Sequence, residues 1–385
     1  MPVAEPNYRY HGDVPSVALF AEAARQLNIC NSCRYCEGYC AVYPALERRT
    51  ELDSGDIAYL ANLCHDCRAC LVACMYAPPH EFGVNPPAIL AQVREVTYQS
   101  NHLMSLPQLL KAPRFSPLTK FSLVALLGIA GVLILVTVDH GLSSLFHILD
   151  PIGSPYAFVS YELIVTVSLV IFGLSLFASL ADVITYWGAT RGLLRDLFRF
   201  EPWAKALRDG ATLRYMRGGA EGCYSTSTRA TSTRRILHYF VSYGFLLCLL
   251  ATVSAAVEQD LQSINPPFDL ISVPVICGVL GGVGLIVGSI GLLYGKRTQD
   301  ATATYGPMTD LDRAFLIALL ALGTTGLLTL IMRSRSLYGF VLAVHLGVVW
   351  ASLLLAPYSK FVHFLYRLLA LVQDNLERED AMAGD

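Results

Sequence analysis

Residues 30–40 of the chain are Cys30-Asn-Ser-Cys33-Arg-Tyr-Cys36-Glu-Gly-Tyr-Cys40. Residues 64–74 repeat the same cysteine spacing as Cys64-His-Asp-Cys67-Arg-Ala-Cys70-Leu-Val-Ala-Cys74. Each segment is a C-x2-C-x2-C-x3-C motif, and together the two motifs hold eight of the eleven cysteines. This duplicated motif decides the organisation of the N-terminal part of the chain.

Three cysteines at this spacing can place three thiolates around one corner of a cubane cluster, and the fourth usually serves the other cluster of a pair. The motif therefore predicts two [4Fe–4S] clusters. One ligand set is Cys30, Cys33, Cys36 and Cys74, and the other is Cys64, Cys67, Cys70 and Cys40.

Structural zinc is the alternative, because cysteine pairs at C-x2-C spacing are common in zinc sites. Zinc takes four ligands, and the C-x2-C-x2-C run leaves a cysteine that zinc does not explain. The proline that usually follows the fourth cysteine directly is absent, since Pro44 and Pro78 come four residues after Cys40 and Cys74. We therefore expect the chain to leave the fourth cysteine of each motif through a different turn, with the cysteine ligands unchanged.

Helical patterns surround both motifs. Residues 14–27 place apolar side chains on one face, with Ser16 as a candidate N-cap, and residues 57–63 form a second helical segment that runs into Cys64. We therefore expect residues 1–97 to form a helical two-cluster ferredoxin domain rather than the compact kind that contains strands. Three isolated cysteines are expected to be structural: Cys223, Cys248 and Cys277.

The composition of the whole chain is that of a membrane protein. The 385 residues are 54% hydrophobic and only 15% charged, and the mean hydropathy is +0.48. Six apolar stretches are long enough to cross about 30 Å of hydrocarbon. They are residues 121–138, 157–180, 236–257, 270–295, 314–332 and 337–358. The net charge of −2 argues against a nucleic-acid-binding protein.

The distribution of Lys and Arg predicts the orientation of these spans. The loop between the second and third spans carries ten basic residues, whereas residues 139–156 and 258–269 carry none. Both termini and the long middle loop are thus expected to be cytoplasmic, and no secretory signal is visible at the N-terminus. A reducing compartment disfavours disulfides and favours metal use of the cysteines. The predicted division is residues 98–120 as an interfacial linker, 121–372 as the six-span domain and 373–385 as a cytoplasmic tail.

Histidines within membrane segments are candidates for function. His238 lies near the cytoplasmic end of the third span, and His363 lies just beyond the sixth span at the same depth. This pair predicts a bis-histidine haem b, as in a cytochrome b-like bundle. His345 is 18 residues before His363, about 27 Å along a helix, so the two cannot bind the same haem. His345 is either a ligand of a second, outer haem or part of an interhelical hydrogen bond.

Several segments resemble the tricarballylate (citrate) utilisation protein B family. They are Asn28-Ile-Cys-Asn-Ser-Cys-Arg-Tyr-Cys-Glu-Gly-Tyr-Cys-Ala-Val-Tyr-Pro, Leu60-Ala-Asn-Leu-Cys-His-Asp-Cys-Arg-Ala-Cys, Tyr76-Ala-Pro-Pro-His-Glu-Phe, Arg234-Arg-Ile-Leu-His-Tyr, Tyr243-Gly-Phe and Pro357-Tyr-Ser-Lys-Phe-Val-His-Phe-Leu-Tyr-Arg. The resemblance implies a bacterial inner-membrane protein that reoxidises the FADH2 of a partner flavoprotein dehydrogenase. Electrons would then pass to the membrane quinone. The partner in that family oxidises tricarballylate, and it would dock on the cytoplasmic face.

Two other functional classes remain open at this stage. The chain could serve a different dehydrogenase or a heterodisulfide-reductase-like system, in which case only the partner would differ. It could also be a membrane redox sensor or transporter without catalytic function. The duplicated cysteine motif and the paired histidines favour an electron-transfer component, and no nucleophile–base set or phosphate-binding loop is apparent in the sequence.

Overall fold

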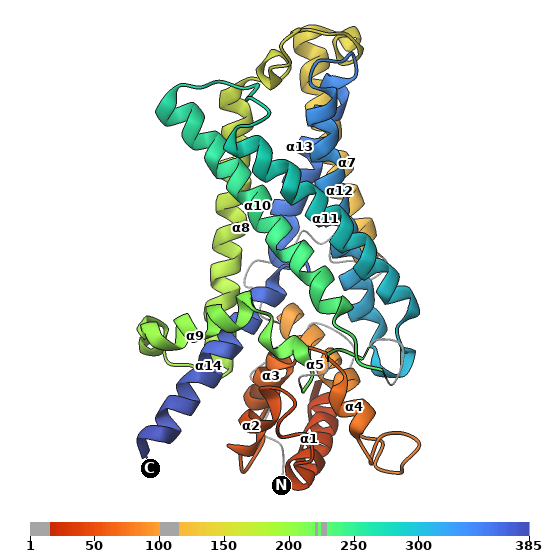
Figure 1. The fold of residues 1–385 in the computed structure, drawn as a ribbon, viewed down its shortest axis with the longest axis vertical. Helices are drawn as coiled ribbons and strands as arrows, with labels where there is room; N and C mark the ends of the chain where they lie inside the picture. The colour runs from red at the N-terminus through yellow and green to blue at the C-terminus, as the bar shows by residue number, and fades with distance from the viewer. Residues whose placement is uncertain (1–15, 101–114, 220–221, 225–228, 385) are drawn as a thin grey trace.

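The computed structural model describes residues 16–100, 115–219, 222–224 and 229–384. These residues form helices and connecting segments, and no strand longer than the single bridge between Cys223 and Thr231 occurs among them. The all-α prediction is therefore confirmed. Figure 1 shows a helical N-terminal domain at one end of a bundle of long helices.

The N-terminal domain consists of five helices: α1 (Ser16–Cys33), α2 (Val42–Glu47), α3 (Ser54–Leu63), α4 (Ala69–Ala73) and α5 (Pro86–Ser100). The central helix is α3, whose residues are almost all buried. Asp53 begins α3 by accepting a hydrogen bond from the backbone of Asp56, and Asp56 bonds the backbone of Asp53 in return. This capping box fixes where α3 starts, and α3 ends directly before Cys64.

Among the described residues, six helices are long and apolar enough to cross a membrane, so the protein is a multi-pass membrane protein. They are α7 (Pro117–His140), α8 (Tyr161–Ala189), α10 (Thr233–Gln262), α11 (Val273–Thr298), α12 (Gly306–Met332) and α13 (Tyr338–Leu355), the last extended by η6 (Ala356–Tyr358). Each overlaps one predicted span. The largest difference is in α8, which continues nine residues past residue 180 and includes the buried Asp182.

Helices α10 and α11 pack closely through glycines. A Cβ atom on Gly281 would stand 2.7 Å from both Cys248 Sγ and the Gly244 carbonyl oxygen. On Gly288 it would stand 2.8 Å from the Leu237 carbonyl oxygen. Small residues at such positions let two backbones approach in lipid. The glycine-rich face of α11 therefore serves helix packing.

The chain bends after the sixth span. Pro357 lies in η6, and a turn at residues 359–361 separates α13 from α14 (Val362–Gly384). His345 and His363 consequently lie on different helices. Helix α14 packs against α3 and against α9 (Phe200–Ala211), which belongs to the loop after α8. Residue 372, the predicted end of the membrane domain, falls inside α14.

Ion pairs join α14 to the N-terminal domain. Arg48 pairs with Asp374 at 2.6 Å and Arg49 with Glu377 at 2.6 Å. Helices α1, α9 and α14 lie at the same end of the molecule, as Figure 1 shows. This arrangement fits the predicted location of both termini on one side of the membrane, which stays a prediction.

Some sequence predictions lie outside the described residues. These are the start of the helix at residue 14 and most of the linker at residues 98–120. The described parts of that linker belong to the end of α5 and the start of α7.

Candidate functional site

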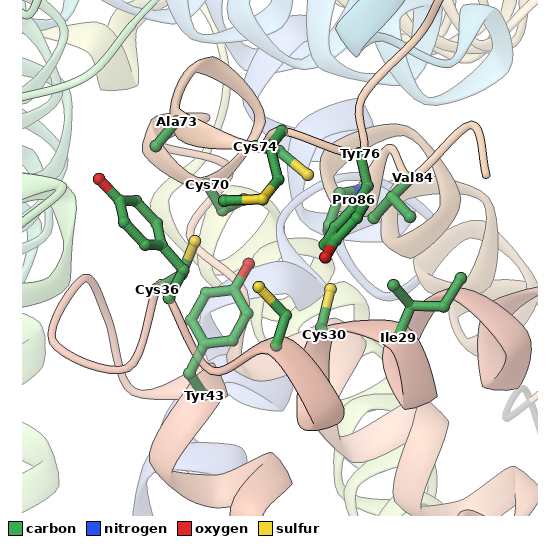
Figure 2. A pocket seen from close by; sticks show the side chains of 13 residues that line it. Ile29, Cys30, Cys36, Tyr43, Cys70, Ala73, Cys74, Tyr76, Val84 and Pro86 are labelled. Atoms are coloured by element: carbon green, nitrogen blue, oxygen red, sulfur yellow. The ribbon is translucent and has the colours of Figure 1, made fainter. Parts of the chain in front are cut away.

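Four predicted ligands of one cluster line a hollow beside the end of α1. They are Cys30, Cys33, Cys36 and Cys74. Figure 2 shows the side chains of Cys30, Cys36, Cys70 and Cys74 around this space. The hollow has about 400 Å³ of empty space, and Cys33 is exposed at its rim. The structure thus gathers thiols from both motifs at one place that solvent reaches.

Four predicted ligands of the other cluster line a second, neighbouring hollow. They are Cys40, Cys64, Cys67 and Cys70. This hollow has about 370 Å³ of empty space, and Cys67 is buried in its wall. Cys70 also lines the first hollow, so the two spaces share a wall. Cys74 of the second motif thus lines the hollow of Cys30, Cys33 and Cys36, and Cys40 of the first motif lines the other hollow. The exchange of the fourth cysteine as a cluster ligand stays a prediction.

The thiol pKa values reflect the same grouping. Burial, together with the thiols of Cys74, Cys36 and Cys33, raises the pKa of Cys30 to about 12. Burial and the thiols of Cys67 and Cys64 raise the pKa of Cys40 well above its usual value. Each thiol is thus close to members of its own predicted set. Because cluster binding takes thiolates, assembly would release protons from these sites.

The cysteine thiols could in principle hold either iron–sulfur clusters or structural zinc. In the described ranges, no three His, Cys, Asp or Glu side chains are gathered closely enough to hold a single metal ion. Each predicted set of four thiols lines one hollow, which is the grouping that the ligands of a [4Fe–4S] cluster need. The residues present therefore fit [4Fe–4S] clusters. Iron ligation itself stays a prediction.

Tyr43 lies between the two hollows and lines both of them. Its side chain is 5% exposed, and its hydroxyl is placed to donate a hydrogen bond to the thiols of Cys36 and Cys70. In Figure 2 the Tyr43 hydroxyl points into the group of sulfur atoms. One buried donor therefore contacts ligands of both predicted clusters. The sequence pattern does not single out Tyr43, because one tyrosine shortly after the first motif has no recognisable spacing.

The surroundings of the two hollows differ in charge. Among the residues that line the first hollow, none carries a charged side chain. The second hollow is lined by Asp66 and Arg68, and Arg94 and Arg367 donate to the backbone beside it. His65, which follows Cys64 directly, places its Nδ1 atom 2.8 Å from the Leu63 carbonyl oxygen.

A segment of the middle loop covers the second hollow. The backbone N–H of Tyr224 donates to the Cys67 carbonyl at 2.9 Å, and the N–H of Gly219 donates to the Tyr39 carbonyl at 3.0 Å. Cys223 is buried and its thiol donates to the Met216 carbonyl, which agrees with a structural role. The middle loop thus contributes to the cluster domain as well as carrying basic residues, a role that its composition did not indicate.

His238 of α10 and His363 of α14 lie side by side, with ring centroids 6.3 Å apart and an interplanar angle of 62°. Metal–imidazole bonds of about 2 Å on opposite sides of one iron give centroids about 6 Å apart, so this separation fits bis-histidine ligation. The Nδ1 atom of His363 bonds the Lys360 carbonyl, which leaves Nε2 as the available ligand atom. The buried Nδ1 of His238 has no hydrogen-bond partner among the described residues.

His345 has a different environment on α13. Its Nδ1 atom lies 2.9 Å from the hydroxyl of Thr325 on α12. Its ring lies against Gly326, where a Cβ atom would stand 3.2 Å from His345 Cε1. The structure therefore joins His345 to a neighbouring helix and does not bring it to the pair formed by His238 and His363.

Comparisons with known proteins match nearly the whole chain. A family model described as citrate utilization protein B matches residues 115–384, and one described as the Fer4-like domain of citrate utilization protein B matches residues 23–100. Citrate utilization protein B of Escherichia coli is 38% identical over 376 residues, which are 95% of each chain. No solved structure matches the chain significantly. The Fer4-like match spans the domain that contains both hollows.

Proposed function

The chain belongs to the citrate utilization protein B family, and from this premise we propose that it transfers electrons from a reduced flavin to a membrane quinone. The electron donor is the FADH2 of a partner dehydrogenase, which acts on tricarballylate or citrate-like acids. FADH2 gives up two electrons and two protons, and the quinone takes up two electrons and two protons. The chain carries the electrons and leaves the substrate chemistry to its partner.

The observation that carries this proposal is the pair of adjacent hollows that the eight cysteines of the two motifs line. Cys30, Cys33, Cys36 and Cys74 would hold the first [4Fe–4S] cluster, and Cys40, Cys64, Cys67 and Cys70 the second. Such clusters, when bound, accept and release one electron at a time. The shared wall of the hollows supports electron transfer between them, because a carrier in each would be separated by little more than Tyr43 and Cys70.

The positions of the hollows support a direction for the chain of carriers. The first hollow has the exposed Cys33 at its rim, where a partner protein has access. The second hollow lies beside the ends of two spans, because Arg234 at the start of α10 pairs with Asp66, and Arg68 bonds Gln299 just after α11. Electrons would therefore enter at the first cluster and leave toward the membrane from the second.

His238 and His363 would hold a haem b, which when bound would supply a one-electron carrier at the membrane. The support is the 6.3 Å separation of the two rings and the hydrogen bond that orients His363. Two rings packed edge to face have a similar separation without any haem. A reduced-minus-oxidised visible spectrum separates these cases, because only the haem gives a cytochrome absorption that is lost in both His238→Ala and His363→Ala.

The proposal places the protein in the bacterial inner membrane with its cluster domain in the cytoplasm. The absence of Lys and Arg from residues 139–156 and 258–269 supports this orientation. The cytoplasmic domain is then on the side where a soluble dehydrogenase is made.

The direct test is quinone-dependent reoxidation of the protein in lipid nanodiscs. We expect the anaerobically reduced protein to lose its iron–sulfur spectrum on addition of a short-chain quinone, with one quinol formed per two electrons. Cys67→Ser should abolish or strongly slow this reaction, whereas Cys277→Ser in α11, away from both hollows, should leave it unchanged. Clusters that reduce and reoxidise without forming quinol would refute the quinone step.

A further inference from the structure

Two arginines converge on the backbone of one predicted cluster ligand. Arg367 of α14 donates through Nη2 to the Cys64 carbonyl oxygen at 2.8 Å, and Arg94 of α5 places Nη1 3.4 Å from the same oxygen. Arg94 also donates to the Ala61 carbonyl at 3.0 Å and is 3% exposed. Both guanidinium groups are thus held by the end of α3 and the start of the second motif.

Neither of these two guanidinium groups forms an ion pair with a carboxylate within 4 Å in the described part of the chain. The nearby Asp66 is 3.5 Å from both Arg68 and Arg234, so its charge is already shared by two other guanidinium groups. Asp312 pairs with Lys296 and Lys360 in the same way. The surroundings of the second hollow therefore carry excess positive charge. Burying unpaired charges is costly, and an anionic group in the hollow would offset that cost.

A [4Fe–4S] cluster with four thiolate ligands is such an anionic group, and it becomes more negative on reduction. Positive charge beside it stabilises the reduced form, so its reduction potential rises. The first hollow has no charged side chain in its wall and gains no such stabilisation. The two clusters should therefore differ in potential although their cysteine spacings are identical.

We propose that Arg94 and Arg367 are positioning residues that hold the second cluster at a higher potential than the first and so direct electrons toward the membrane. The proposal rests on the proposed function for the presence of the clusters. It adds the order of their potentials and the two residues that set it. Arg367 lies one helical turn after His363 on α14, so the same helix would connect the second cluster to the candidate haem site.

The test is an EPR-monitored redox titration of the full-length protein in detergent. In the unchanged protein we expect two cluster signals with separate midpoints. Arg94→Gln and Arg367→Gln should each change the ratio of reduced to oxidised higher-potential cluster about tenfold at a fixed potential, a shift of 59 mV to lower potential. The lower-potential signal should move by less than half as much. Arg94→Lys keeps the positive charge, so the potential of its higher-potential cluster should stay close to that of the unchanged protein.

Arg25→Gln in α1 is the matched control, because Arg25 is exposed and pairs with Glu22 away from both hollows. If either glutamine variant fails to assemble a cluster, the lysine variants at the same positions provide the measurement, with a smaller shift expected. Unchanged potentials, or a larger shift of the lower-potential signal, would overturn the inference while leaving the proposed function standing. No cluster signal in the unchanged protein would instead refute the proposed function.

Discussion

Tyr43→Phe removes one hydroxyl from the wall shared by the two hollows and changes little else. The Tyr43 side chain is 5% exposed, and its hydroxyl is placed to donate to the thiols of Cys36 and Cys70. The phenyl ring keeps the packing, so the hydrogen bond is the main loss. A hydrogen bond to a ligand sulfur stabilises the more negative, reduced cluster. We therefore expect the variant to have lower cluster potentials.

The size of the shift follows from the strength of a hydrogen bond to a charged group, roughly 1.5–3 kcal/mol. Only the difference between the oxidised and reduced clusters counts, which we take as roughly one third to one half of that value. The resulting change of about 0.5–1.5 kcal/mol corresponds to about 20–65 mV for one electron. The hydroxyl has a single proton and is shared between the thiols of Cys36 and Cys70. The range of about 20–65 mV is therefore the total shift, divided between the two clusters.

The assay is the same redox titration with EPR detection, with Tyr35→Phe as the matched control. Tyr35 also lines the first hollow, but its side chain is 61% exposed and solvent competes for its hydroxyl. The control should shift by much less. A shift of Tyr43→Phe to higher potential, or no shift in either cluster, would refute the role assigned to this hydroxyl.

Three further predictions concern stability, each measured by thermal or denaturant unfolding of the detergent-solubilised protein. Burial raises the pKa of Glu95, so the folded state favours the protonated acid; Glu95→Gln should stabilise the protein as the pH rises above the ordinary value of 4.5, with no gain below it. Gly281→Val should destabilise the protein by about 1–3 kcal/mol, because its Cβ would meet Cys248 Sγ at 2.7 Å. Asp374→Ala should cost about 3–5 kcal/mol, because the carboxylate is 1% exposed and pairs with Arg48 at 2.6 Å and with Arg378 at 2.9 Å.

The controls for these predictions come from the same helices. Gly295→Val in α11 should have little effect, since nothing lies within 4 Å of its added Cβ. Asp380→Ala in α14 should cost less than about 1 kcal/mol, because Asp380 is 71% exposed in its pair with Arg199. Equal losses for Gly281→Val and Gly295→Val would contradict the close packing of α10 on α11. A gain of stability by Glu95→Gln at pH 4 equal to that at pH 7 would contradict the pKa argument.

Features of the fold that follow from a repeated spacing or from the length of an apolar stretch could be predicted from the sequence. The spacing of Cys30, Cys33 and Cys36, repeated in the second motif, predicted which thiols group together. The length of the apolar stretches predicted six spans, and the family resemblance is confirmed by matches over residues 23–100 and 115–384. These features depend on local periodicity, which a single sequence displays directly.

Features that depend on tertiary contacts could not be predicted in the same way. Arg94 and Arg367 are 273 positions apart, and only the fold brings both to the carbonyl oxygen of Cys64. The pairing of His238 with His363 was anticipated from membrane depth. The bend at Pro357 was not, because a proline near a span end predicts neither the direction nor the destination of the next helix.

The most direct measurement of the central claim is the content of iron, acid-labile sulfide and haem per chain in anaerobically purified protein. We expect about eight non-haem irons, as many sulfides and one haem. Cys67→Ser should lower the non-haem iron and leave the haem unchanged. Stoichiometric zinc in place of iron, with no sulfide, would contradict the electron-transfer account.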